Sequence, residues 1–264
     1  MSPVARLVVN ADDAGLDEAG DARILEAADA GLLRSASVVA SGRTARAFVA
    51  AATSAGLGVG LHLDLVELPP LGGPYRTLGR DRGRKTEVWA RAASGALDAV
   101  EVADEVRLQW EHLVSLGADP DHLDAHNHLQ LFRPVLAGLV AALGDRDDLV
   151  VRRPFAVAAG LTHAPPFPAG TLDEAAWDAA RGAARWPRCP RFCGYRFGRR
   201  PGTEALPAPA PGTTELMVHL GGGSDRAFAH APERDLELAF VCDSSRRREI
   251  EALGYRIGRF GDVA

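Results

Sequence analysis

Short apolar segments rich in β-branched residues alternate along this chain with longer segments of helical periodicity. This alternation is typical of successive βα units, in which each helix returns the chain to the same end of a parallel sheet. It predicts an α/β fold, more specifically a distorted (βα) TIM-like barrel. The expected strands are Leu7 to Asn10, Ser35 to Ala40, Gly58 to Leu65, His122 to Ala125, Leu149 to Arg152, Thr214 to Leu220 and Tyr255 to Phe260. The expected helices are Ala19 to Ala30, Ala45 to Ala55, Glu101 to Leu116, Pro134 to Leu143 and Ser245 to Leu253.

Two segments interrupt the alternation. Pro69 to Lys85 contains five basic residues, and Pro201 to Gly212 alternates proline with small residues. Both compositions are typical of surface loops, and the basic one is either a solvated face or a lid over a cleft. Because neither an internal repeat nor a linker divides the 264 residues, we predict one domain over residues 1–264.

Charge and hydropathy argue against several classes of partner. The formal net charge is −5, so the chain lacks the basic excess that favours binding to phosphate backbones. No apolar run approaches the ~20 residues that span a bilayer, and the N-terminal apolar stretch is too short for a signal peptide. We expect a cytoplasmic protein with neither nucleic-acid nor membrane partners. Three cysteines without a Cys-x-x-Cys pair favour ordinary thiols over a disulfide or zinc framework; these are Cys189, Cys193 and Cys242.

Ionisable side chains gather where the expected strands end. The carboxyl ends of parallel strands in a barrel lie on one rim, where the active sites of such folds are built. Four separate segments therefore deliver carboxylates and imidazoles to one place: Asp12 and Asp13, His62 and Asp64, Asp124 with His126 and His128, and His219.

Each of these residues could also have a purely structural role. An Asp pair can cap the following helix, a lone imidazole on an apolar strand can be a hydrogen-bonded core residue, and His219 can bond within its loop. Alternatively, one Asp binds a cation while its neighbour accepts a proton, and histidines two residues apart converge on one ion. One Asp and two His from three strands would leave open positions, as catalytic metal sites require.

Several motifs resemble one known family in order and approximate spacing over nearly the whole chain. They are LVVNADDAG, SASVVASG, VGLHLDL, DHLDAHNHLQLFRPV, VVRRP, ELMVHLGG and GYRIGRFGDV. Together they are similar to the YdjC-like carbohydrate deacetylases. The resemblance implies a distorted (βα) barrel, a single divalent cation and hydrolysis of the N-acetyl group of a sugar or short oligosaccharide.

The resemblance also implies a role for four of the site residues. His62 and His126 match the two metal-binding histidines of the family, Asp13 would be the third ligand, and Asp12 would be the general base. His219 is the expected proton donor, and we expect the substrate to be bound by His128, Asp124 and Arg153. The family points to Mg²⁺, whereas two imidazoles and one carboxylate also suit Zn²⁺.

Other functions remain open from the sequence alone. A metal-dependent amidohydrolase or phosphoesterase could use the same ligands, although amidohydrolases usually carry His-x-His on the first strand, where this chain has Asp12 and Asp13. A sugar-binding accessory protein without activity is a further alternative. Ala14, Ala125 and Leu220 depart from the residues usual in the family, which leaves the substrate open. The resemblance also suggests a homodimer.

Overall fold

The fold is that of a computed structural model, which describes residues 4–79, 85–155, 169–182, 184–187, 190–195, 197–221 and 231–262. Its framework is one sheet of eight strands, and all the strand pairs are parallel. The strands are β1 (Ala5–Ala14), β2 (Ser35–Val38), β3 (Gly58–Leu63), β4 (His122–Ala125), β5 (Val150–Val151), β6 (Arg191–Cys193), β7 (Gly212–Val218) and β8 (Arg256–Ile257).

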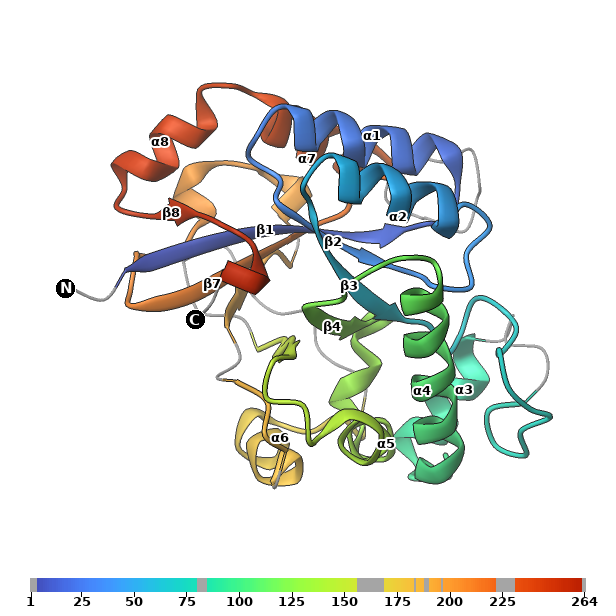
Figure 1. The fold of residues 1–264 in the computed structure, drawn as a ribbon. Helices are drawn as coiled ribbons and strands as arrows, with labels where there is room; N and C mark the ends of the chain where they lie inside the picture. The colour runs from blue at the N-terminus through green and yellow to red at the C-terminus, as the bar shows by residue number, and fades with distance from the viewer. Residues whose placement is uncertain are drawn as a thin grey trace.

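The strand order makes β1 the centre of the sheet. The order is β5-β4-β3-β2-β1-β7-β6, and β8 pairs with the start of β1, beside Arg6 and Leu7. Figure 1 shows the sheet curling between two groups of helices. The predicted α/β fold is therefore confirmed, in the form of a curled parallel sheet that resembles part of a barrel.

Helices cover the sheet on its outer side. They are α1 (Glu18–Asp29), α2 (Ala45–Ser54), α3 (Lys85–Ala93), α4 (Ala99–Ser115), α5 (Arg133–Leu143), α6 (Glu174–Arg181), α7 (Ala231–Cys242) and α8 (Arg246–Ala252). Short 3-10 turns lie at His126–Leu131, Phe197–Arg199, Thr203–Ala205 and Phe260–Asp262. In Figure 1, α1, α2 and α7 lie above the sheet, and α3 to α6 lie below and to the right. Within the described residues, no helix is long and apolar enough to span a bilayer.

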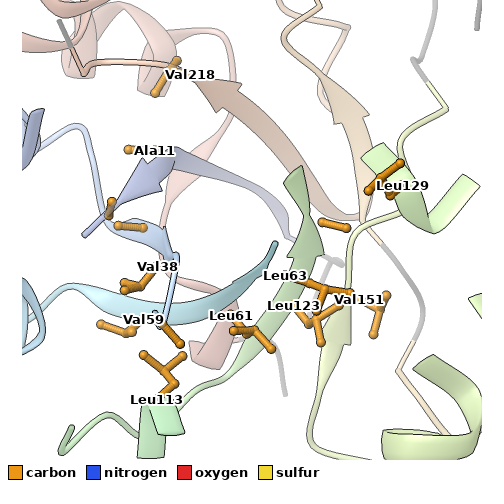
Figure 2. Packing of buried hydrophobic residues seen from close by; sticks show 14 of the residues in the cluster. Ala11, Val38, Val59, Leu61, Leu63, Leu113, Leu123, Leu129, Val151 and Val218 are labelled. Carbon is orange, nitrogen blue, oxygen red and sulfur yellow. The ribbon is translucent and has the colours of Figure 1, made fainter. Parts of the chain in front are cut away.

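Local sequence explains where the main helices begin. Asp17 and Asp98 cap α1 and α4, because their carboxylates accept hydrogen bonds from the N–H groups of Gly20 and Val100. The buried stripe of α4 includes Val106 and Leu113. Figure 2 shows Leu113 packing toward Val59 of β3, so the outer face of the sheet is apolar.

The inner face of the curl is polar. Along β1, Leu7, Val9 and Ala11 join the outer core, whereas Asn10 and Asp12 point to the other side. The neighbouring strands contribute buried polar side chains of the same kind, namely Ser37, His62, His122, Asp124, Arg152 and Glu215. Because buried polar groups must satisfy one another, these side chains form a dense hydrogen-bonded layer.

Most predicted elements are confirmed to within a few residues, and β4 has the bounds that the sequence predicted. Other strand boundaries differ from the prediction: β1 starts at Ala5 and continues through Ala14, β2 and β3 each end two residues early, β7 is shifted two residues toward the N-terminus, β5 is reduced to Val150–Val151, and β8 to Arg256–Ile257. Helices α3, α6 and α7 and strand β6 were not predicted.

The basic loop predicted at Pro69 to Lys85 lies on α4, since Arg76 and Thr77 donate backbone hydrogen bonds to Glu101. Its residues 80–84 fall outside the described chain. Cys193 and Cys242 are free thiols, while Cys189 lies outside the described residues.

Candidate metal centre

A bulge in β1 directs two neighbouring carboxylates to one place. Ala11 pairs with Ala36 and Ala14 with Val38, so three steps along β1 match two steps along β2. Asp13 lies in this bulge and has a φ of 68°, a left-handed conformation that is unusual for residues other than glycine. Asp12 and Asp13 thus lie within the strand, not after it as predicted, and oxygens of both lie close to His62.

Strand register sets the orientation of His62. His62 of β3 lies directly beside Asp124 of β4, and its Nδ1 is 2.5 Å from Asp124 Oδ1. Although burial alone would lower the pKa of His62, Asp124 raises it well above its ordinary value. The carboxylate therefore fixes the ring so that Nε2 faces the bulge, 3.3 Å from Asp13 Oδ1.

His126 approaches the same point from the end of β4. Its Nδ1 lies 3.1 Å from Asp13 Oδ1 and 3.1 Å from His62 Nε2, while its Nε2 lies 3.4 Å from Glu67 Oε1. Both imidazoles thus have a carboxylate beside the nitrogen that points away from the centre, as metal-ligating histidines usually do.

Three donor atoms from three elements therefore converge on one point: Asp13 Oδ1, His62 Nε2 and His126 Nδ1. Their separations of 3.1 to 3.3 Å match the spacing of two ligands held at about 2.1 Å from one ion at 90–110°, which is roughly 3.0–3.4 Å. Asp13 Oδ1 is buried and receives no well-aligned hydrogen bond among the described residues. The donor set fits a small divalent cation with open positions for water or substrate.

His128 does not join this group. The strand ends at Ala125, and Asn127 and His128 have φ of 56° and 55°, so the alternation of a strand is lost. The ring of His128 packs instead against Phe192 and Tyr195, at centroid distances of 5.8 and 5.0 Å. The alternative in which residues 126 and 128 converge on one ion is therefore not realised, and a substrate-binding role for His128 stays a prediction.

Arg152 occupies the centre of the polar layer, although it was not among the site residues predicted from the sequence. Its guanidinium donates to both oxygens of Asp12, at 2.6 and 2.7 Å, and to Glu215, and it lies 2.7 Å from Asp124. Burial raises the pKa of Glu215 despite this contact. The guanidinium of Arg152 thus pairs with three buried carboxylates and fixes the orientation of Asp12.

His219 stands at the end of β7, on the other side of Asp12. Its Nε2 is 4.0 Å from Asp12 Oδ2, and about a third of its side chain is exposed. Its backbone N–H donates to Glu237 at 2.5 Å. An imidazole that is partly open to solvent and close to a buried carboxylate can exchange protons with a bound substrate.

A model of the family described as YdjC-like protein matches residues 6–254. The chain belongs to the YdjC-like family.

Curated relatives of this YdjC-like protein match it over nearly its full length. A Klebsiella pneumoniae (strain 342) protein named chitooligosaccharide deacetylase is 32% identical over 264 residues, covering 97% of this chain and 98% of the relative. An Enterobacter sp. (strain 638) protein of the same name is 28% identical, with the same coverage. A crystal structure from Enterococcus faecalis V583, of a protein named after cellobiose-phosphate cleavage, has a TM-score of 0.73 and 16% identity, covering 98% of each chain. That likeness supports the fold alone.

Two residues predicted to bind substrate in this YdjC-like protein make other contacts in the structure. Asp124 is fully buried and bonds Ser37, His62 and Arg152. The side chain of Arg153 pairs with the carboxylates of Glu174 and Asp178 on α6. Substrate contacts for both stay predictions. The geometry places Asp124 as the partner that orients His62.

Cation binding by this YdjC-like protein should strengthen as pH rises. Burial alone would lower the pKa of His126, but its contacts with Asp13 and Glu67 outweigh burial and raise that pKa to about 9. Because a cation requires the neutral ring, the apparent association constant should rise about tenfold per pH unit for each proton displaced, up to that pKa. Calorimetric titration with Mn²⁺ between about pH 6 and pH 8 measures this slope. A constant affinity across that range would contradict the assignment of His126 as a ligand.

Proposed function

We propose that this chain is a metal-dependent carbohydrate deacetylase that hydrolyses the N-acetyl group of a sugar or short oligosaccharide. The observation that carries the proposal is the convergence of Asp13, His62 and His126 beside Asp12 and His219. It is supported by curated relatives named chitooligosaccharide deacetylase that match 97% of the chain. An N-acetylated amino sugar or its oligomers are accordingly the proposed substrates.

Asp13, His62 and His126 would hold the cation. A divalent ion at this position supplies Lewis-acid chemistry, since it makes a water more acidic and polarises a carbonyl oxygen. We propose that this ion is Mg²⁺ or Zn²⁺. The family resemblance favours Mg²⁺, whereas the donor set of two nitrogens and one oxygen also suits Zn²⁺. Asp13 contributes one oxygen to the site, because Arg234 donates to its other oxygen at 3.0 Å.

Asp12 is the proposed general base. Arg152 holds both its oxygens in a buried position, and Asp12 lies next to the ligand group but on the side that faces His219. A carboxylate in this position can take one proton from the attacking water. The oxygen of that water then forms a bond to the acetyl carbonyl carbon.

His219 is the proposed general acid. The bond between the carbonyl carbon and the sugar nitrogen can break only if the nitrogen gains a proton, because an amide anion is a poor leaving group. His219 lies at the partly exposed end of the site, 4.0 Å from Asp12, and can donate that proton from Nε2. The oxygen of the water leaves in acetate, the proton taken up by Asp12 restores His219, and the second proton of the water ionises from the acetic acid and protonates the free amino group of the sugar.

Acetate release from purified protein tests this proposal directly. The protein would be stripped of metal, reloaded separately with Mg²⁺, Mn²⁺, Co²⁺ or Zn²⁺, and incubated with N-acetylglucosamine and its oligomers. We expect acetate and free amine to form in equal amounts with at least one ion, and none in the stripped protein. Binding of the sugars without acetate release would instead support an accessory binding protein. Turnover of a phosphoester but no N-acetyl sugar would overturn the proposal.

A further inference from the structure

Helix α7 (Ala231–Cys242) places two buried charged residues against the site from a distant part of the sequence. Arg234 and Glu237 lie one turn apart on the helix and are only 7% and 5% exposed. Neither belongs to the proposed cation ligands or the proposed acid and base. Charged side chains are rarely buried to this extent unless they are paired, so their partners indicate what they do.

Arg234 joins two parts of the site. Its Nη2 donates to Asp13 Oδ2 at 3.0 Å, and its Nη1 donates to the carbonyl oxygen of Gly221 at 2.9 Å. The first bond leaves Oδ1 as the oxygen of Asp13 that faces His62 and His126. The second holds the chain just two residues after His219. One rigid guanidinium therefore fixes both the ligand carboxylate and the turn that follows β7.

Glu237 holds the other end of this turn. Its carboxylate accepts the backbone N–H of His219 at 2.5 Å and also that of Gly198. A Cβ at position 198 would lie 2.7 Å from Glu237 Oε1, so the close approach of this backbone requires glycine. Burial raises the pKa of Glu237 to about 8, because the charged form loses its hydration in this position.

We propose that α7 is a positioning helix, in which Arg234 orients the cation ligand Asp13 and Glu237 fixes the backbone of His219 for proton transfer. The inference rests on the proposed function for the role of His219, but its claim about Asp13 concerns cation binding alone. The two residues therefore act on different steps. Arg234 controls the affinity for the cation, and Glu237 controls turnover.

The test measures cation affinity and steady-state kinetics for variants of α7 in the full chain. Arg234→Met should weaken Mn²⁺ binding about 10- to 100-fold in a titration without substrate, the usual cost of losing a partner of a metal ligand. Glu237→Ala should bind Mn²⁺ as the parent does but lose about 10- to 100-fold in kcat with little change in KM, because His219 is displaced. Glu237→Gln, which retains an oxygen acceptor for the His219 N–H, should recover most of that kcat.

Matched controls separate positioning from general destabilisation. Asp235→Asn alters the residue between these two, whose exposed carboxylate pairs with Arg23, and should change neither readout. Should Arg234→Met fail to fold, Arg234→Lys keeps the charge but not the two-armed geometry and should still bind Mn²⁺ about tenfold more weakly. The proposal would be overturned if Arg234→Met and Glu237→Ala lost cation affinity and kcat to the same extent, in proportion to their loss of thermal stability. If the parent released no acetate, the proposed function would fail while the Arg234 titration would still decide the claim about Asp13.

Discussion

The His126→Ala variant should retain its fold but lose the cation and, with it, all measurable acetate release. His126 supplies one of the three proposed donor atoms, and its Nδ1 lies 3.1 Å from both other donors. Replacing even an outer partner of a ligand costs about 10- to 100-fold in affinity, so losing a ligand itself should cost more than about 100-fold. Elemental analysis and calorimetric titration measure the cation, and circular dichroism checks the fold.

His219→Ala is the matched control for this variant. It removes an imidazole from the same site, and that imidazole is not among the three proposed ligands. It should therefore keep the parent affinity for the cation while losing turnover. If His126→Ala bound the cation and turned over substrate like the parent, the ligand assignment would be wrong.

The Asp12→Asn variant should bind the cation normally but lower kcat by roughly 10²–10⁴-fold, the usual contribution of a general base. Asparagine has nearly the same shape but cannot take a proton from water. Arg152 would still pair with Asp124 and Glu215, so the polar layer should remain folded. Stopped assays of acetate release, together with metal analysis of the same sample, measure both quantities.

Asp21→Asn provides the corresponding control in the same part of the chain. The carboxylate of Asp21 is also buried, but it accepts a hydrogen bond from the N–H of Gly15, and asparagine can keep that bond. Its kcat should remain near that of the parent. An Asp12→Asn variant with undiminished kcat would show that another group acts as the base.

The sequence predicted the elements whose periodicity is strong and local. Helix α4 has a buried apolar stripe and a capping Asp98, and β4 is bounded by polar residues on both sides. Helix α7 lacks such a pattern, because its buried face carries Arg234 and Glu237 where apolar residues would be expected. The charged residues that interrupt the apolar pattern of α7 are the same ones that contact the site. They are the reason why this helix was not predicted.

The choice between Arg152 and Arg153 could not be made from the sequence. Both follow the apolar pair of β5, and only the pairing of Val150 with His122 shows that residue 152 points to the inner face beside Asp124. The bulge at Asp13 was equally unpredictable, since a non-glycine residue at positive φ has no local sequence signal here. The strand ends thus indicated where the polar residues meet, but not which of them point inward.

The ligand set also bears on how the protein unfolds. Asp13, His62 and His126 come from β1, β3 and the end of β4, so a bound cation would tie together three segments of the sheet that are far apart in the sequence. An unfolded chain cannot bring these side chains together, and any ion that prefers the native state shifts the folding equilibrium, by about 2.7 kcal/mol at a free concentration 100 times its Kd. The ion proposed to support catalysis would therefore also act as a non-covalent crosslink, and removing it should lower the free energy of unfolding as well as the activity.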